Sequence, residues 1–335
     1  MRDYKFLILV MLLSIVLMLS GCKAIVEKLS FKKTEDVSNA NYLIEDENFI
    51  DVEKGGLRKT VLYYKDDKGL VIPVMRQIPW EEAIGRSAIN QLIDTPVIRD
   101  ELAKIGLMPV LPSGTEVTDM SINEGLCKVD FNKDFLSYHD EKDEKVILQS
   151  LVYTLTEFPA ISKVQITVEG QTLKKLTYGS KIGGPLERKN INLAQDLSDE
   201  TIPMVVYYKS TSNGKDSFYI PVTKAVNALK GDIKSALVAL LEGAPENTGL
   251  YSEIPVGTSI NDVYVKNGVA YIDFSEEVKK VSESTQHQQS LIYELGLTLR
   301  EIESSVSQVR ILSNGTEIQL SSDVSLNLPD FSNEF

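Results

Sequence analysis

Hydrophobic and polar positions follow a pattern that occurs twice along this chain in the same order. The segments VLYYKDDKGLVIPV (61–74) and VVYYKSTSNGKDSFYIPV (205–222) place β-branched and aromatic residues on both sides of a polar turn, which predicts two strands. Apolar residues at helical spacing follow in each copy and predict an amphipathic helix. These residues are Trp80, Ile84, Ala88 and Leu92 in the first copy, and Val226, Leu229, Ile233, Leu237 and Leu240 in the second.

The second half of each copy begins with a loop, LPSGT (111–115) or IPVGT (254–258). Two strands separated by NEG or KNG come next, and the glycine suits the positive φ of a tight hairpin. A second amphipathic helix and a last strand close the unit. The apolar helix positions are Ile147, Leu151, Leu155 and Phe158, and Leu291, Leu295, Leu299 and Ile302. The order β-β-α-β-β-α-β predicts an α+β fold, with a sheet packed against two helices.

Matching residues keep their order through both copies, so the chain contains two tandem copies of one small domain. Tyr63 and Tyr64 align with Tyr207 and Tyr208, Pro73 with Pro221, Pro112 with Pro255, and Gln149 with Gln289. We expect the first domain at residues 57–178 and the second at 203–321. Residues 179–202, which hold glycine, proline and charge without sustained periodicity, form the linker, and 322–335 form a tail.

The N-terminus has the layout of a secretory signal. Arg2 and Lys5 precede the apolar run FLILVMLLSIVLML, which ends at residue 19. At about 1.5 Å per residue this run reaches only about 21 Å, short of the roughly 30 Å hydrocarbon core. A cleaved signal peptide is therefore favoured over a retained transmembrane helix.

The end of this run, LSGC, resembles the bacterial lipobox. We expect cleavage between Gly21 and Cys22, which makes residues 1–21 the signal peptide, and lipidation of the Cys22 thiol. Two acyl chains are sufficient for stable membrane anchoring without a spanning helix. Residues 22–56 are polar and poorly periodic, which is typical of a tether between the lipid and a folded body.

The charge of the chain narrows the range of partners. There are 35 basic and 48 acidic residues, a net charge of −13, and loss of the signal peptide makes it more negative by one. Phosphate backbones and anionic lipid heads repel such a surface, which argues against a nucleic-acid partner. The one cysteine besides Cys22 is Cys127, so we expect no intrachain disulfide.

Asp130 and Asp273 end equivalent strands, in VDF and IDF, and are the strongest candidates for duplicated catalytic acids. Neither has a second acid or a base at a matching position, so we interpret them as acceptors of backbone N–H bonds at the exit turn. Asn132 and Ser275 follow them and are residue types that cap helices. On the same strand, Cys127 shares the inward face with aliphatic and phenylalanine residues, which favours a core position.

The remaining candidates do not assemble a reactive site. His139 and His287 fall at different positions of the two copies, and the run HDEKDEK around His139 is more typical of an acidic helix start than of a metal site. The sequence contains no phosphate-binding glycine loop and no GxSxG motif. In the adjacent tyrosine pairs, one ring should face the core and the other solvent. We therefore expect no catalytic residues, no cofactor and no metal.

The motifs together resemble the GerM family of sporulation and germination lipoproteins, which carry two GerMN domains. The resemblance depends on the lipobox cysteine, the YIPV or VIPV strand ends, the helix end LLEGAP, the P-x-G-T loop, the V/I-D-F strand end and the QSLxY helix. It covers residues 61–176 and 203–320. The first copy departs from the pattern at LIDTP, where the second has EGAP.

The resemblance implies a non-enzymatic envelope lipoprotein, similar in its domains to the ring-building modules of secretion machines. Its expected place is the outer face of the cell membrane, between the mother cell and forespore membranes during sporulation. There it would help to assemble or stabilise a channel complex by contacts with envelope proteins or with further copies of itself. The alternatives are a peptidoglycan-directed enzyme, acting on spore cortex, and a muropeptide-binding lipoprotein.

Overall fold

The computed structural model describes residues 56–335, except 80–82, 212 and 282–283. The predicted signal peptide with its lipobox, the predicted tether up to residue 55, and Trp80 lie outside the described residues. Among those that are described, no helix is both long and apolar enough to cross a membrane.

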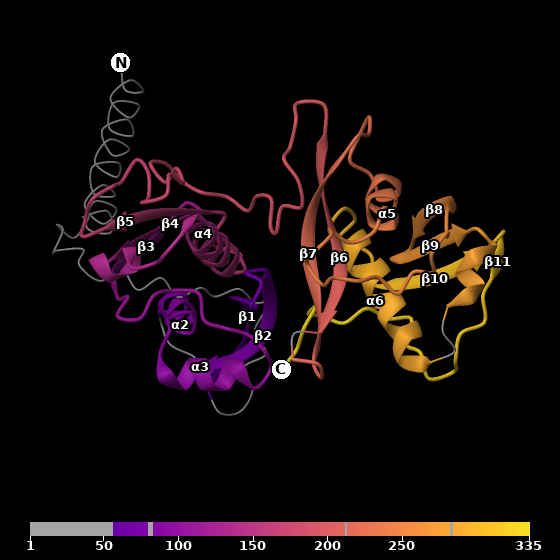
Figure 1. Cartoon of the computed structure of the whole chain (residues 1–335), viewed down its shortest axis with the longest axis horizontal. Helices are drawn as coiled ribbons and strands as arrows, with labels where there is room; N and C mark the ends of the chain where they lie inside the picture. The colour runs from indigo at the N-terminus through magenta and orange to yellow at the C-terminus, as the bar shows by residue number, and fades with distance from the viewer. Residues whose placement is uncertain (1–55, 80–82, 212, 282–283) are drawn as a thin grey trace, which may run out of the picture. The chain divides into compact units, whose positions relative to one another are not determined.

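The first repeated domain opens with the antiparallel hairpin of β1 (Leu57–Lys65) and β2 (Val71–Pro79). Helices α2 (Ile84–Asn90) and α3 (Pro96–Ala103) follow. A sheet is then built from three strands in the order β3-β4-β5, with β3 antiparallel and β5 parallel to the central strand β4 (Figure 1). The elements of this second half are β3 (Val117–Asn123), β4 (Leu126–Phe131), the 3₁₀ helix η1 (Lys133–Leu136), α4 (Glu141–Leu155) and β5 (Lys163–Val168).

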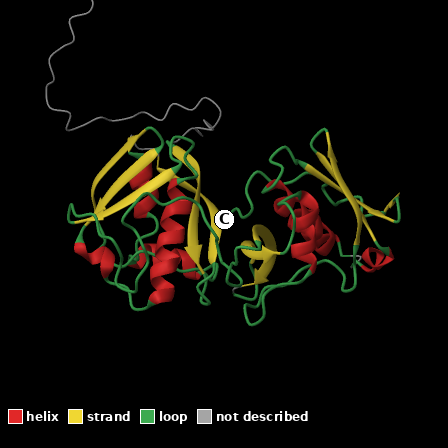
Figure 2. Ribbon diagram, turned by 90° about the horizontal axis from the view of Figure 1, so that it is seen from above, coloured by secondary structure: helices red, strands yellow, loops and turns green. Residues whose placement is uncertain are grey.

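The second domain repeats this order with two differences: one helix stands in place of α2 and α3, and a short strand follows the last one. Its hairpin consists of β6 (Ile202–Thr211) and β7 (Ser217–Val226), and its sheet has the order β11-β10-β9-β8. Helix α4 packs against β1, β2 and β5, and the long helix of domain 2 packs against β6 and β10. Figure 2 shows the helices and sheets of the two domains from above. The remaining elements are α5 (Ile233–Leu241), β8 (Ile260–Lys266), β9 (Val269–Phe274), the 3₁₀ helix η2 (Glu276–Lys280), α6 (Thr285–Arg300), β10 (Gln308–Ser313) and β11 (Thr316–Glu317).

The structure confirms the predicted α+β fold of two repeated domains. The hairpin turns between the sheet strands form as expected, with positive φ at Glu124 and Gly125 in one domain and at Asn267 and Gly268 in the other. The repeated P-x-G-T loops are also turns, because each threonine hydroxyl donates to the proline carbonyl three residues earlier.

The helix predictions were wrong in detail. In domain 1 the predicted helix corresponds to α2, but a second helix, α3, was not predicted; Thr95 caps it and Pro96 stands at its first position. In domain 2, Val226 belongs to strand β7 and Leu229 lies fully exposed in the loop, so α5 begins only at Ile233. Asp232 accepts a hydrogen bond from the Ser235 N–H at 2.9 Å and fixes this later start.

Candidate functional site

The two strand-ending aspartates hold turns in their own domains. Asp130 accepts hydrogen bonds from the hydroxyls of Thr118 and Thr167 and from the Gly170 N–H, the last at 2.8 Å. Asp273 accepts the equivalent bond from the Gly315 N–H at 2.8 Å. Burial raises the pKa of Asp130, but the hydrogen bonds outweigh it and bring the pKa below its usual value. Each carboxylate therefore accepts a backbone N–H bond, as the sequence indicated, but the turn that it fixes follows the neighbouring parallel strand and is not the exit turn of its own strand.

Asn132 and Ser275 do not cap the helices that follow them, so this expectation was wrong. Their side chains instead reach the preceding P-x-G-T loop, where Asn132 accepts from the Glu116 N–H and Ser275 from the Ser259 N–H, both at 3.1 Å. These short polar residues thus join the strand end to the loop in both domains.

The acidic run in domain 1 forms a helix start. Asp140 is the N-cap of α4 and accepts the Asp143 N–H at 2.8 Å, and His139 lies just before it. In domain 2, His287 Nδ1 lies 3.2 Å from Glu253. Over the described ranges, no group of three or more His, Cys, Asp or Glu side chains is arranged to hold a metal ion. Cys127 is fully buried, which raises the pKa of its thiol to about 12 and keeps it protonated.

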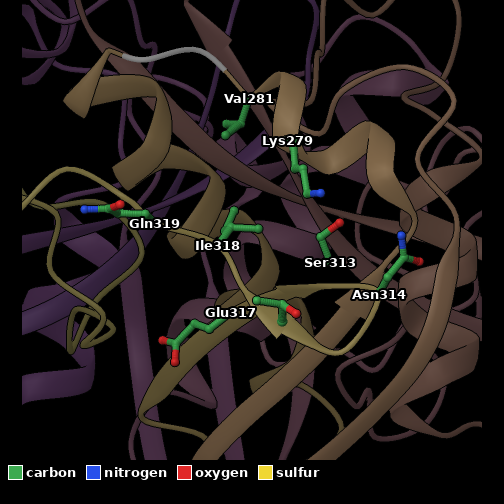
Figure 3. A pocket seen from close by; sticks show the side chains of 8 residues that line it. Lys279, Val281, Ser313, Asn314, Glu317, Ile318 and Gln319 are labelled. Carbon is green, nitrogen blue, oxygen red and sulfur yellow. The ribbon is translucent and has the colours of Figure 1, made fainter.

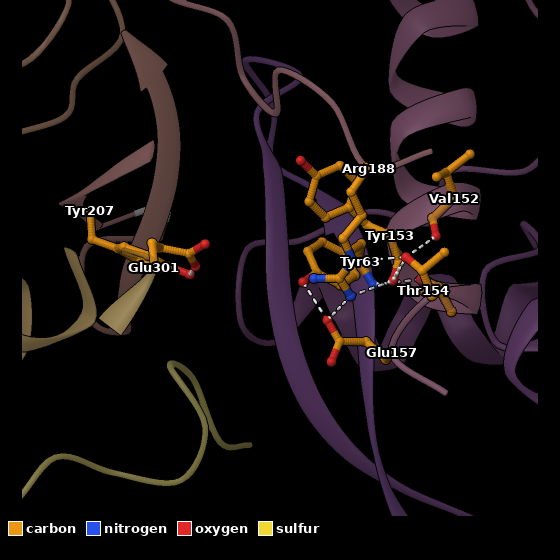
Figure 4. A network of polar contacts seen from close by, with 9 residues as sticks. Tyr63, Val152, Tyr153, Thr154, Glu157, Arg188, Tyr207 and Glu301 are labelled. Atoms are coloured by element: carbon orange, nitrogen blue, oxygen red, sulfur yellow. Dashed lines mark hydrogen bonds and ion pairs between the residues drawn. The ribbon is translucent and has the colours of Figure 1, made fainter. Parts of the chain in front are cut away.

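The tyrosine pairs differ from expectation, because neither ring of a pair faces solvent. Tyr63 and Tyr207 are 6% and 8% exposed, although the alternation of a strand predicted an exposed position. Their hydroxyls donate to Glu157 at 2.8 Å and to Glu301 at 2.9 Å (Figure 4). The backbone N–H groups of both tyrosines donate to threonine hydroxyls of the long helices, so the two networks match bond for bond.

Arg188 of the linker completes the network in domain 1. Its guanidinium donates to Glu157 and to the Tyr153 carbonyl, and lies 4.9 Å from the centre of the Tyr153 ring. Burial opposes the charge of Arg188, but the surrounding tyrosines and Glu157 outweigh this effect and raise its pKa. The pKa of Glu301 is raised because the surrounding protein displaces water from its carboxyl group, and the negative charge of Glu157 adds to the shift. The linker is therefore part of the packed structure.

Two asparagines that follow the domains join the hairpins β1–β2 and β6–β7. Asn192 accepts from the Val71 N–H at 2.8 Å and donates to the carbonyls of Val71 and Pro221 at 2.7 and 2.8 Å. Asn333 makes the same set at the matching positions. It accepts from the Tyr219 N–H at 2.8 Å and donates to the carbonyls of Pro73 and Tyr219 at 2.7 and 2.9 Å.

We refer to these two residues as the asparagine clamps. Each satisfies the strand of its own domain and reaches a carbonyl of the other domain. Neither was identified from the sequence, because they lie in the linker and tail, where the periodicity is lost. The available signal was their equivalent position, 14 and 12 residues after the expected ends of the two copies.

Two surface depressions could accept a ligand. The larger one, of about 1020 Å³, lies beside the Asn192 clamp and is lined by side chains of both signs, among them Lys68, Lys142, Asp196 and Glu246. A smaller one, of about 430 Å³, lies at the β10–β11 hairpin (Figure 3). Its wall includes Ser313, whose buried hydroxyl has no hydrogen-bond partner among the described residues. The lining of the larger depression also includes Asp140 and Glu141, whereas the smaller one has a single acid, Glu317.

A buried carboxyl group in α6 is the most perturbed acid of domain 2. Glu294 is fully buried, and one of its oxygens accepts the Glu253 N–H at 2.9 Å while the other has no partner in the described part of the chain. Burial raises its pKa to about 8. The neighbouring Lys209 contacts Glu253 at 3.0 Å and the Ser290 hydroxyl at 2.8 Å.

Comparison with known proteins identifies the repeated domain. The family model described as "Germane: Sporulation and spore germination" matches residues 61–174 and 205–319. The chain is 31% identical to the spore germination protein GerM of Bacillus subtilis (strain 168) over 264 residues, which cover 76% of this chain and 71% of that protein.

Its structure is similar to that of the tandem GerMN domains of the sporulation protein GerM from Bacillus subtilis. The TM-score is 0.70 at 28% sequence identity, over 83% of this chain and 99% of that one. The sequence motifs, the repeated fold and these matches agree, and the chain belongs to the Germane family of sporulation and spore germination proteins.

Proposed function

We propose that this protein is a lipid-anchored, non-enzymatic sporulation protein that helps to assemble or stabilise an envelope complex by protein–protein contacts. The observation that carries the proposal is the likeness to the tandem GerMN domains of a sporulation protein along nearly all of that chain. On this proposal the complex is a channel between mother cell and forespore, and the protein acts from the outer face of the membrane.

The hydrogen bonds of the two repeated aspartates support this proposal. Asp130 and Asp273 accept hydrogen bonds from the turns of their own sheets, which accounts for their recurrence without catalysis. Large apolar side chains are instead exposed in the loops of domain 2, where Leu229 and Val256 are almost fully accessible. Exposed apolar residues contribute more to contacts with another protein than to acid–base chemistry.

A comparison of two sets of substitutions distinguishes a protein that acts by protein–protein contacts from an enzyme. Asp130→Asn combined with Asp273→Asn should leave spore formation intact, since the amide oxygens still accept from the turns. Reversal of exposed charges on the domain surface should reduce spore formation, since it weakens contacts with a partner. Spore counts, with protein abundance measured in parallel, test both. Loss of sporulation in the aspartate double variant at normal abundance would favour the enzyme.

The larger depression, of about 1020 Å³, offers a defined place for a ligand, so a muropeptide-binding lipoprotein is the alternative function to test. A ligand that binds only the folded state raises the melting temperature by mass action. If this depression is only a space between packed segments and not a binding site, muropeptides at millimolar concentration should leave the melting temperature unchanged. A concentration-dependent increase that Lys142→Glu abolishes would establish the ligand function in place of the contact function.

A further inference from the structure

Strand β8 forms one edge of the domain 2 sheet. The strand order is β11-β10-β9-β8, and no strand pairs with the outer side of β8 within the described residues. Asp262, Tyr264 and Lys266 are exposed along one face of this strand, and Tyr264 is 47% accessible. An unpaired edge strand is a template for pairing with another chain.

The backbone groups that face outward can be assigned from the hairpin. Lys266 and Val269 flank a two-residue turn and are therefore a hydrogen-bonded pair, and the pairs alternate along an antiparallel ladder. Tyr264 then bonds inward to Tyr271, whereas Val263 and Val265 present their N–H and carbonyl groups outward. The Val263 N–H donates to the side chain of Asp262 at 2.9 Å, which agrees with this assignment.

The sequence of β8 is complementary to itself in an antiparallel arrangement. If two copies pair about Tyr264, Asp262 of each copy lies opposite Lys266 of the other, and Val263 lies opposite Val265. Neither Asp262 nor Lys266 forms an ion pair with any residue that the structure describes. Asp262 accepts the Val263 N–H, and strand pairing would turn this N–H to the partner strand and release the carboxylate. Opposite charges directly across two strands stabilise the pairing.

The aromatic rings extend the same complementarity. Tyr264 stacks on Tyr271 with ring centres 4.9 Å apart and an angle of 11° between the planes. Pairing about Tyr264 would bring the two Tyr264 rings together on the same face and produce a row of four tyrosines. Aromatic cross-strand neighbours add to the stability of a sheet.

The equivalent edge of domain 1 lacks these features. Ser121 of β3 pairs with Lys128, as Tyr264 pairs with Tyr271. Pairing of two copies about Ser121 would place Asp119 opposite Asn123, without an ion pair or an aromatic row. The self-complementary edge is thus a property of domain 2.

We propose that two copies of this chain associate through β8, paired antiparallel about Tyr264, to join their domain 2 sheets into one. The partner is a second copy, because the charges of β8 complement those of the same strand in reverse. The interface is small, so the association is weak and depends on local protein concentration.

Disulfide trapping tests the predicted register. The Tyr264 pair is a non-hydrogen-bonded pair, whose Cα atoms lie about 4.5 Å apart, within the range of a disulfide. Full-length protein in detergent carrying Tyr264→Cys should form a disulfide-linked dimer under copper phenanthroline at least about tenfold faster than Ser121→Cys. Both variants and the parent keep the native cysteines, so any dimer from those appears in all three.

A charge swap tests the partner. Asp262→Lys and Lys266→Asp, each alone, should weaken the dimer about tenfold, because both ion pairs become repulsive. The two changes together restore opposite charges and should restore the dimer, as measured by trapping and by sedimentation with Tyr264 intact. Equal melting temperatures of the variants confirm folding.

Three results would overturn the proposal. They are trapping of Tyr264→Cys no faster than that of Ser121→Cys, failure of the double swap to restore the dimer, and trapping of a different protein in its place in sporulating cells.

Discussion

At the scale of the residue, two buried glutamates at the long helices behave in opposite ways. Glu144 accepts hydrogen bonds from the Tyr138 hydroxyl at 2.9 Å and from two backbone N–H groups at 2.7 and 2.8 Å. Burial raises its pKa, but the hydrogen bonds outweigh this and lower it. Glu294 has one oxygen without a partner in the described structure and a pKa raised to about 8. One carboxylate is thus stabilised by its site, and the other is not.

The raised pKa of Glu294 predicts a pH dependence of stability. Between an unfolded pKa of about 4.3 and the folded value of about 8, the folded state binds more protons, so stability falls as pH rises. Glu294→Gln should therefore increase the free energy of unfolding at pH 8 by on the order of 1 kcal/mol, with a smaller gain at pH 5. Urea unfolding at both pH values measures this.

Glu144→Gln is the matched control for that experiment. The lowered pKa means that the carboxylate contributes stability above its unfolded pKa and loses it as pH falls through the folded value. The variant should lose about 1–3 kcal/mol at pH 7, because it cannot satisfy the same donors. A gain at pH 8 in Glu144→Gln, or a loss in Glu294→Gln, would contradict the assignments.

The strand-ending aspartates differ in their number of partners. Asp130→Ala should lower the free energy of unfolding by about 2 kcal/mol and Asp273→Ala by about 1 kcal/mol, since Asp130 accepts three hydrogen bonds and Asp273 accepts the one from Gly315. Thermal unfolding of the two variants checks the order. Equal losses would show that the two threonine contacts add nothing.

At the scale of the element, the sequence predicted the repeated strands and hairpins because their signals are local. Alternation, turn glycines and the P-x-G-T loop all act within a few residues. The sequence did not predict correctly which positions of the two long helices are structurally equivalent. Gln149 and Gln289 match in sequence, but the bonds of Tyr63 to Glu157 and of Tyr207 to Glu301 show a structural match displaced by about one helical turn.

The burial of Tyr63 and Tyr207 could not be read from their strands. A strand pattern shows which face is apolar but not what covers the other face. Here Glu157, Glu301 and the linker residue Arg188 provide the cover, and they come from parts of the chain far from the tyrosines in sequence. The asparagine clamps were not predicted for the same reason, because their partners are also far from them in sequence.

The clamps should determine how firmly the linker and tail are held. Asn192→Ala and Asn333→Ala each remove three hydrogen bonds and leave strand carbonyls unpaired, so each should cost about 1–3 kcal/mol. Faster proteolysis within 179–202 should accompany Asn192→Ala. Asp330→Ala, at an exposed site in the same tail as Asn333, is the control and should have little effect. Resistance equal to that of the parent would contradict the role of the clamps.

At the scale of the whole molecule, we propose that a lipid anchor and a tether hold two repeated domains at the membrane, where the domains act by binding other proteins. Cys22→Ala removes the thiol that we propose is lipidated, and the protein should move from the membrane to the soluble fraction or remain with an uncleaved signal. Metabolic labelling with a fatty acid and the mass of the N-terminal fragment check this. Label incorporated into the Cys22→Ala protein would contradict lipidation at this cysteine.

The central claim is that the folded domains act by binding other proteins. The most direct measurement is photo-crosslinking in sporulating cells from position 256, which is 95% exposed, with the matching loop position 113 of domain 1 for comparison. The account predicts discrete adducts with envelope proteins or with a second copy. Adducts confined to peptidoglycan, together with cleavage of that peptidoglycan by the purified protein, would contradict it.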